Sequence, residues 1–202
     1  RESAMTTENI RLIQPTESRK QPYLDFVAEF QQPGEDVTYI GGQPDEDFNA
    51  FVQRMRDDAQ GKNLPPGRIP ATEYWLLRDD RILGRCSLRH QLTDALRDFG
   101  GHIGYAVRPS ERGKGYATLM LRLMVDAARQ MEIDRVLVTC ASDNIASARV
   151  IIKCGGILDS ESYSPLGGRF TKRFWIEVPS VSLSRTASFN SRLLRAFLLP
   201  HA

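Results

Sequence analysis

The sequence predicts a single domain of the mixed α/β (α+β) class, on three observations. The chain has 202 residues, of which 41% are hydrophobic, and this is enough to bury one core of ordinary size. Runs typical of short strands dominate the first half of the chain. Apolar residues at helical spacing then predict one long crossover helix at 113–131 between two strands, followed by a short helix and two closing strands. This order indicates a mixed sheet flanked by helices.

Charge and composition argue against several classes of protein. The net charge is +2, from 27 Lys and Arg and 25 Asp and Glu, and both signs are interleaved along the chain. We therefore expect no nucleic-acid partner and no membrane-surface patch. Because there is no apolar run of 18 residues and no signal-peptide core, we expect a soluble, cytoplasmic protein. Cys86, Cys140 and Cys154 lack the spacing of metal ligands, so we expect buried, reduced thiols and no metal.

The first elements are predicted from apolar periodicity and from proline and glycine. Residues 1–4 look like a remnant of an expression vector, so we expect the native chain to begin at Met5 and the domain to span 5–178. In chain order we predict a strand at 10–13, a helix at 22–30, a possible strand at 37–40 and a helix at 45–60. Asp45, Glu46 and Asp47 begin that second helix, where the dipole favours carboxylates.

The middle and the end of the domain are predicted to be strand-rich. Prolines and a glycine make 64–70 a loop. Strands at 72–78 and 81–90 are expected to form a hairpin around Asp79 and Asp80. The segment 92–98 is a loop or a helical turn. After the glycines at 155 and 156, we predict closing strands at 157–160 and 170–178 around a flexible loop at 161–169.

The tail at 179–202 differs from the domain in composition. A serine-rich linker precedes apolar residues that share one stripe of a predicted helix at 189–199. The stripe is too short to span a membrane, so we expect it to dock on the domain or on a second subunit. A homodimer is therefore possible.

A glycine-rich turn carries the first functional signal. The strand at 102–107 ends before Pro109, because proline has no N–H for a ladder. The turn Arg112-Gly113-Lys114-Gly115-Tyr116-Ala117 then opens the long helix. Helix N-termini leave backbone N–H groups unpaired, and glycines let a ligand approach them, so the pattern favours a phosphate or diphosphate flanked by two cations. Neither a P-loop nor a dinucleotide-binding fingerprint fits this spacing.

A second motif lies downstream of the long helix. A buried strand is predicted at 135–140, followed by a short helix that ends at a glycine. Asn144 begins that helix, Ser147 follows three residues later, and Gly155 follows eleven residues after the asparagine.

Together the two motifs resemble those of the GNAT superfamily of N-acetyltransferases. Arg112, Gly115 and Ala117 match the loop pattern, and Asn144, Ser147 and Gly155 match the second segment. The resemblance covers 10–178 and is strongest from 101 to 156. It implies a mostly antiparallel mixed sheet, splayed at the cofactor strand, and acetyl-CoA as co-substrate. The residues that it implies for the cofactor are Ala106, Val107, Arg112, Gly113, Lys114, Gly115, Tyr116, Ala117, Asn144 and Ser147.

The resemblance also implies direct transfer, in which an amine attacks the thioester within a ternary complex. Such a reaction needs a donor for the developing oxyanion, and by family position this is the backbone near Val107. Many relatives use a tyrosine as the acid for the leaving thiolate, but the matching position here is Ile151. Tyr105, Tyr116 and Tyr163 are possible substitutes, and each is also a candidate packing residue.

The base and the acceptor stay open at this stage. His102 is the first candidate base, because an imidazole can take a proton at neutral pH. A structural histidine beside two glycines is the alternative, and Glu73 and His90 are weaker candidates. The acceptor is a small-molecule or peptide amine. Because the usual tyrosine is missing, a catalytically degenerate CoA-binding sensor or scaffold is the second possible function.

Overall fold

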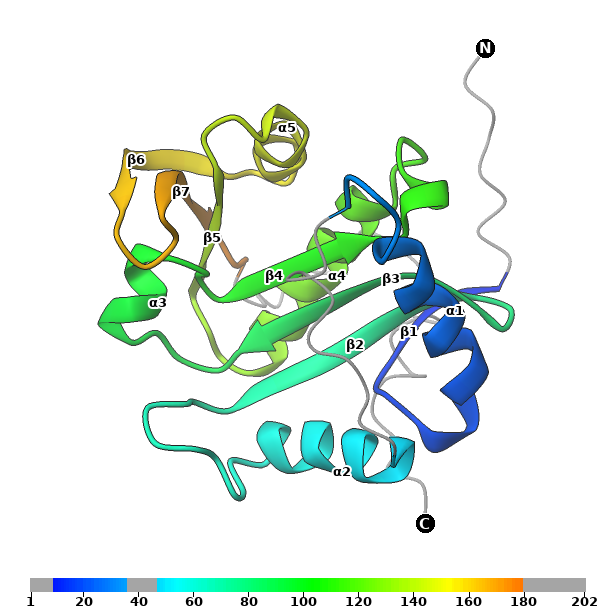
Figure 1. The fold of residues 1–202 in the computed structure, drawn as a ribbon. Helices are drawn as coiled ribbons and strands as arrows, with labels where there is room; N and C mark the ends of the chain where they lie inside the picture. The colour runs from blue at the N-terminus through cyan, green and yellow to red at the C-terminus, as the bar shows by residue number, and fades with distance from the viewer. Residues whose placement is uncertain (1–8, 36–46, 180–202) are drawn as a thin grey trace, which may run out of the picture.

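The computed structural model describes residues 9–35 and 47–179, which form two antiparallel sheets with helices on both faces (Figure 1). The four-stranded sheet has the order β1-β2-β3-β4, and the three-stranded sheet has the order β5-β7-β6. The strands are β1 (Ile10–Ile13), β2 (Ala71–Arg78), β3 (Arg81–Arg89), β4 (Ile103–Val107), β5 (Arg135–Ala141), β6 (Ile157–Ser164) and β7 (Arg169–Glu177). The predicted α/β class is confirmed.

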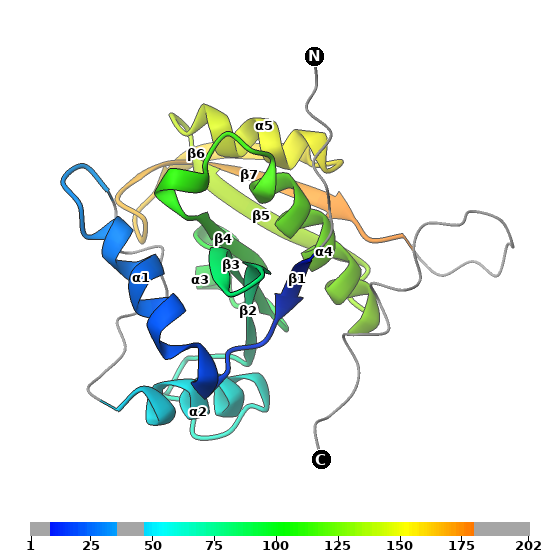
Figure 2. The ribbon, with the colours of Figure 1, turned by 90° about the vertical axis from the view of Figure 1, so that its right-hand side faces the viewer.

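Two layers of helix enclose the strands (Figure 2). On one face lie α1 (Lys20–Phe30) and α2 (Phe48–Ala59), and on the other lie α4 (Tyr116–Gln130) and α5 (Ile145–Lys153). Short pieces complete the chain: the 3₁₀ turns η1 (Glu17–Arg19) and η3 (Pro109–Glu111), and the helix α3 (Asp94–Asp98). Each layer packs on its own core, because successive residues of a strand point to opposite faces.

The two cores share strand β2. Trp75 lies in the core under α1 and α2, where its ring stacks on Tyr23 with centroids 4.8 Å apart. Its neighbour Leu76 lies in the core under α4 and α5. Met120 and Met124 of α4 are buried in the same core. Every one of these side chains is fully buried, so both cores exclude water at the centre of the sheet.

Most predicted elements in the described residues are found, with small shifts at their ends. The segment 92–98 contains a helical turn, α3, which Thr93 caps by accepting a hydrogen bond from Leu96 N at 3.2 Å. The predicted strand at 37–40, the start of the helix predicted at 45–60, and the tail helix lie outside the described residues. Cys86 and Cys140 are buried and reduced as expected, whereas Cys154 is only half-buried.

One predicted loop was wrong. The segment 161–169 is mostly strand, because β6 continues to Ser164 and β7 already begins at Arg169. Tyr163 pairs with Phe170 across this hairpin, and their rings meet edge-on with centroids 5.7 Å apart. The polar and exposed composition of β6 hid this strand, since an edge strand that buries little shows no apolar alternation.

The described residues contain neither a helix that could span a membrane nor a side-chain cluster that could hold a metal ion. None of the described helices combines the length and the hydropathy that crossing a membrane requires. Residues 9–35 and 47–179 also contain no cluster of three or more His, Cys, Asp or Glu side chains placed to hold a metal ion.

The residue before β4 contacts β5 near its start, at a junction that requires a glycine. His102 N donates to Leu137 O at 2.7 Å, directly before β4 begins. Gly101 lies so close to β5 that a Cβ there would be 2.4 Å from Leu137 O. This contact sets how far apart the two sheets lie.

Replacing Gly101 with alanine tests the junction. Gly67 is a matched control, because a Cβ there would meet nothing within 4 Å, and both glycines have positive φ, +62° and +79°. We expect Gly101→Ala to lower the free energy of unfolding by about 1–3 kcal/mol more than Gly67→Ala, because backbone must move at the junction. Denaturant unfolding measures this difference. Equal losses would show that the strands tolerate a wider separation.

Candidate active site

The candidate site is the opening between β4 and β5. β4 pairs with β3, and β5 pairs with β7, but within the described residues β4 and β5 form no ladder with each other. From their contact at His102 and Leu137, the two strands diverge toward their carboxyl ends (Figure 1). The edge of β4 that faces β5 therefore keeps backbone groups available to a ligand.

The amide of Val107 points into this opening. Arg108 N donates to Leu83 O of β3, at 2.9 Å. Successive N–H groups of a strand point to opposite edges, so the N–H of Val107 is directed away from β3 and toward β5. This places a backbone donor where the sequence predicted one.

The glycine turn presents further backbone donors at the end of the opening. Gly113 and Gly115 both have left-handed backbone, with φ of 75° and 85°. Gly115 is the N-cap of α4 and offers no side-chain cap, so the amides of the first helical turn lack a partner from that residue. The turn can therefore accept an anion such as a diphosphate, as the sequence predicts.

The two cations of the turn are both paired with carboxylates. Arg112 donates to Glu35 through two bonds of 2.9 and 2.6 Å. Lys114 donates to Glu111 at 2.9 Å and to Ser110 O at 3.2 Å. The pair of Arg112 is exposed, so exchanging its carboxylate for a ligand phosphate costs about 1 kcal/mol or less.

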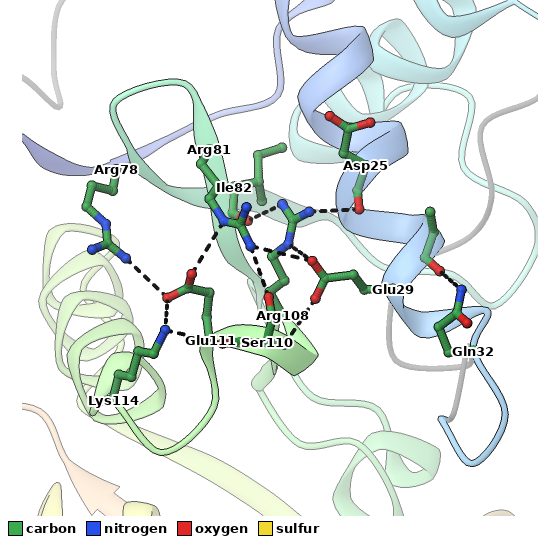
Figure 3. Close-up of polar contacts among 11 residues, drawn as sticks. Asp25, Glu29, Gln32, Arg78, Arg81, Ile82, Arg108, Ser110, Glu111 and Lys114 are labelled. Carbon is green, nitrogen blue, oxygen red and sulfur yellow. Dashed lines mark hydrogen bonds and ion pairs between the residues drawn. The ribbon is translucent and has the colours of Figure 1, made fainter.

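Glu111 is the centre of a network that holds the turn (Figure 3). It is buried, and besides Lys114 it contacts Arg78 at 3.1 Å and Arg81 at 3.4 Å. Burial acts to raise the pKa of Glu111, but Lys114 and the two arginines outweigh it and hold the pKa below its usual value. One carboxylate among three cations leaves the neighbourhood of the turn positive.

Arg108 fixes the end of β4 to α1. Its guanidinium is buried, pairs with Glu29, and donates to Asp25 O at 3.0 Å and Ile82 O at 3.2 Å (Figure 3). Glu29 also accepts from Ser110 N at 3.0 Å. Sequence reasoning missed Arg108, Glu29 and Glu111, because Arg108 and Glu29 are 79 residues apart and Glu111 and Arg78 are 33 apart, which leaves no local pattern. A charged residue directly after an apolar strand was the one available signal.

His102 lies at the junction, not in the opening. Its side chain is buried, and its Nδ1 accepts from Leu137 N at 2.9 Å, so the neutral ring carries its hydrogen on Nε2. Burial, with help from Arg97 and Arg89, lowers the pKa of His102 to about 4. A general base must offer a free lone pair. The geometry therefore favours the structural alternative for this residue.

Tyr105 and Ser147 meet across the opening. A hydrogen bond of 2.7 Å joins Tyr105 Oη of β4 to Ser147 Oγ of α5. Asn144 Oδ1 accepts from Ser147 N at 2.9 Å and so caps α5, as the sequence predicted. Burial raises the pKa of Tyr105 to about 12, although the bond with Ser147 opposes the shift. The phenol is therefore protonated at neutral pH and can donate.

Glu73 of β2 is the candidate base that is aligned, across the sheet, with a residue of β4 at the opening. Through Ser87 of β3 it lies in register with Gly104 of β4. Its carboxylate is buried and paired with Arg85. Burial raises the pKa of Glu73, while the positive charge of Arg85 opposes this.

The structure does not bring the remaining candidates into the opening. His90 bonds the hydroxyl of Thr72 at 2.8 Å. Tyr116 is buried at the start of α4, under the guanidinium of Arg78. Tyr163 is exposed on β6. Ile151, which stands where many relatives have their tyrosine, is fully buried in the core.

The comparison with known families decides the class. Residues 10–157 match the family model described as Acetyltransferase (GNAT) domain. The chain belongs to this family. It is an acetyltransferase, and the resemblance found in its motifs is confirmed.

Two related proteins of Bacillus subtilis are also named as N-acetyltransferases. The chain is 29% identical over 135 residues to "Uncharacterized N-acetyltransferase YnaD" of Bacillus subtilis (strain 168), which covers 64% of this chain and 70% of that protein. It is 35% identical over 78 residues to "Probable N-acetyltransferase YjcK" of the same organism, covering 38% of this chain and 42% of that protein.

Solved structures share the fold. A "Probable acetyltransferase" matches with a TM-score of 0.64 at 19% identity, over 84% of this chain and 93% of that one. RimL, named as a ribosomal L7/L12 alpha-N-protein acetyltransferase in complex with coenzyme A, matches with a TM-score of 0.57 at 20% identity, over 85% and 96%. The spermidine N-acetyltransferase of Vibrio cholerae, in complex with CoA and spermine, matches with a TM-score of 0.58 at 12% identity, over 84% and 96%.

The pH dependence of stability tests the structural role of His102. Its pKa of about 4 in the folded state lies below the ordinary 6.5, so the unfolded chain takes up the proton first as the pH falls. We expect the free energy of unfolding to fall between pH 6.5 and pH 4, by about 1–3 kcal/mol. His102→Asn keeps an acceptor but cannot titrate, and should lose most of this dependence. Urea unfolding across that pH range measures it.

Two controls separate the structural role from a catalytic one. His102→Leu leaves the N–H of Leu137 without its acceptor, and should cost about 1–3 kcal/mol at pH 7. His102→Asn should keep turnover within about threefold of wild type, whereas loss of a general base lowers rates about 10²–10⁴-fold. A loss of the second size in a stable His102→Asn variant would restore the base assignment.

Proposed function

We propose that this acetyltransferase moves the acetyl group of acetyl-CoA to a primary amine, by direct attack within a ternary complex. The observation that supports this most strongly is the opening between β4 and β5. It combines a directed backbone donor at Val107, a hydroxyl pair at Tyr105 and Ser147, and an anion-binding turn at the same ends of the strands. Acetyl-CoA, when bound, supplies the activated thioester.

The residues present fit a diphosphate-bearing co-substrate. The turn offers glycines with open backbone and a helix N-terminus, and its surroundings are positive because Glu111 is outnumbered by its cations. Arg112 would exchange Glu35 for a phosphate, and Lys114 would bind a phosphate while it keeps its contact with Glu111. Asn144 shapes the opposite wall by holding the start of α5.

Each chemical requirement has a proposed residue. The N–H of Val107 would stabilise the developing oxyanion, which is usually the largest single contribution to such catalysis. Tyr105 and Ser147 would supply a proton to the leaving thiolate. Glu73 remains the proposed base, and its place two strands from the opening requires a water to carry the proton.

Binding through the turn is tested at Gly115. Gly115→Val adds a branched side chain at a left-handed position where a diphosphate would approach the amides, and we expect acetyl-CoA affinity to fall at least about tenfold, roughly 1.4 kcal/mol. Gly67→Val is the matched control, since Gly67 also has positive φ and lies in a different loop. Calorimetry on both folded variants gives the dissociation constants. Equal affinities would remove the turn from the cofactor site.

The hydroxyl pair is tested by Ser147→Ala and Tyr105→Phe. Thiols have a pKa near 8.5 and leave without strong acid help, so each variant should lower kcat only by about 10–100-fold. Acetyl-CoA affinity should change little. Stopped-flow CoA release under single turnover measures the chemical step, and an unchanged rate in both variants would exclude the pair as the acid.

A second outcome separates catalysis from the alternative function. A protein that binds acetyl-CoA through the turn, yet releases no CoA with any amine, would behave as the sensor or scaffold that the absence of the usual tyrosine left open.

A further inference from the structure

The two sides of the opening differ in what they offer. Tyr105 and Ser147 lie on the side of α4 and α5, where their hydrogen bond joins β4 to α5. On the side of α1 and α2, alternation places Gly104 and Ala106 of β4, and Ala106 belongs to the core on that side. Ala106 is buried in that core, whereas a Cβ at Gly104 would meet no atom closer than 3.5 Å, so the space lies beside Gly104. An amine therefore approaches the reacting carbon from the face of Gly104, opposite the hydroxyl pair.

Arginines dominate this acceptor face. Arg85 and Arg89 belong to β3, Arg97 to α3 and Arg173 to β7. Glu73 pairs with Arg85, and Asp98 pairs with Arg173 at 2.6 Å. Within residues 9–35 and 47–179, no carboxylate forms an ion pair with Arg89 or Arg97. The face as a whole is therefore positive.

Arg89 lies beside Gly104 of β4. Its NH1 lies 3.9 Å from the position that a Cβ of Gly104 would occupy. NH1 donates to Gly100 O and Gly101 O, at 3.0 Å each, and these carbonyls fix the guanidinium without neutralising it. A guanidinium has five N–H donors in a planar fork, so Arg89 retains donors for a planar or tetrahedral anion.

Burial makes this charge costly. The side chain of Arg89 is half-buried, and burial lowers its pKa, with the like charge of Arg85 acting in the same direction. Glu73 opposes this shift, but its carboxylate already forms an ion pair with Arg85, so it compensates the charge of Arg89 only in part. An anion supplied by a ligand would complete that compensation.

We infer that the acceptor is an amine that carries an anionic group, a carboxylate or a phosphate, which Arg89 binds beside Gly104. This rests on the proposed function of the opening. Ser87, in register with Gly104, precedes Arg89 by two residues, or about 7 Å along the strand. A polyamine would add positive charge to a face that is already positive, and is disfavoured.

Matched acceptor pairs test the inference. The panel contains each α-amino acid with its amide, O-phosphoethanolamine with ethanolamine, and short peptides with Asp or Asn at the second position, and it includes spermidine. CoA release gives kcat/KM for each. We expect the anionic member of at least one pair to exceed its neutral partner tenfold or more. Which pair responds identifies the source as a free carboxylate, a phosphate or an acidic peptide.

Variants connect the preference to Arg89. Arg89→Gln should lower kcat/KM for the preferred anionic acceptor at least tenfold and leave its neutral partner and acetyl-CoA affinity nearly unchanged. Arg89→Lys, which keeps the charge and is the safer variant for folding, should keep part of the preference. Arg11→Gln, at an exposed position of β1 on the far edge of the sheet, is the control and should change nothing.

The failures are distinguishable. Acetylation of amines without preference for an anion, or with spermidine as the best acceptor, overturns this inference and leaves the proposed function intact. An anionic preference that survives Arg89→Gln also overturns it. If acetyl-CoA binds and no amine in the panel is acetylated, the proposed function fails, and this inference fails with it.

Discussion

The structure depends on one short contact, where β4 and β5 meet before they separate. His102 and Leu137 exchange two hydrogen bonds at that point, and Gly101 allows the backbones to approach closely enough to make them. Beyond it, β4 continues to pair with β3, and β5 with β7, so the divergence is imposed by two separate antiparallel sheets. A buried imidazole with a neutral ring suits such a junction, because it accepts one backbone hydrogen bond without bringing a charge into the core.

Ion pairs hold the far end of the opening, whereas hydrogen bonds to the backbone hold the junction. Arg108 ties the end of β4 to α1, and Glu111 ties the glycine turn to the hairpin between β2 and β3. Removing one partner of the largely buried Arg108–Glu29 pair leaves an uncompensated charge, at a cost of about 3–5 kcal/mol. The exposed pair between Arg112 and Glu35 costs far less to open. Lys114, paired with Glu111, therefore helps to hold the shape of the turn, whereas Arg112 is free to exchange its partner.

The sequence predicted what is local and missed what is distant. The glycine turn, the long helix and the cap at Asn144 each follow from a few neighbouring residues, and the structure has them. Arg108, Glu29 and Glu111 gave no such pattern, since each partner lies on another element. The strand predicted at 102–107 begins one residue later, at Ile103, so His102 lies directly before it, and the orientation of its ring toward Leu137 depends on the neighbouring sheet. The exposed strand β6 was underestimated because apolar alternation marks only strands that bury one face.

The arrangement separates the two proton transfers that the proposed reaction needs. A proton given to the leaving thiolate comes from Tyr105 and Ser147, on the side of α4 and α5. A proton taken from the amine leaves on the other side, where Glu73 is held by Arg85. The same positive face that would bind an anionic acceptor also lowers the pKa of an ammonium group placed there, because like charges disfavour its charged form. The arginines would thus orient the acceptor and favour the neutral, nucleophilic amine, which reduces how basic the carboxylate has to be.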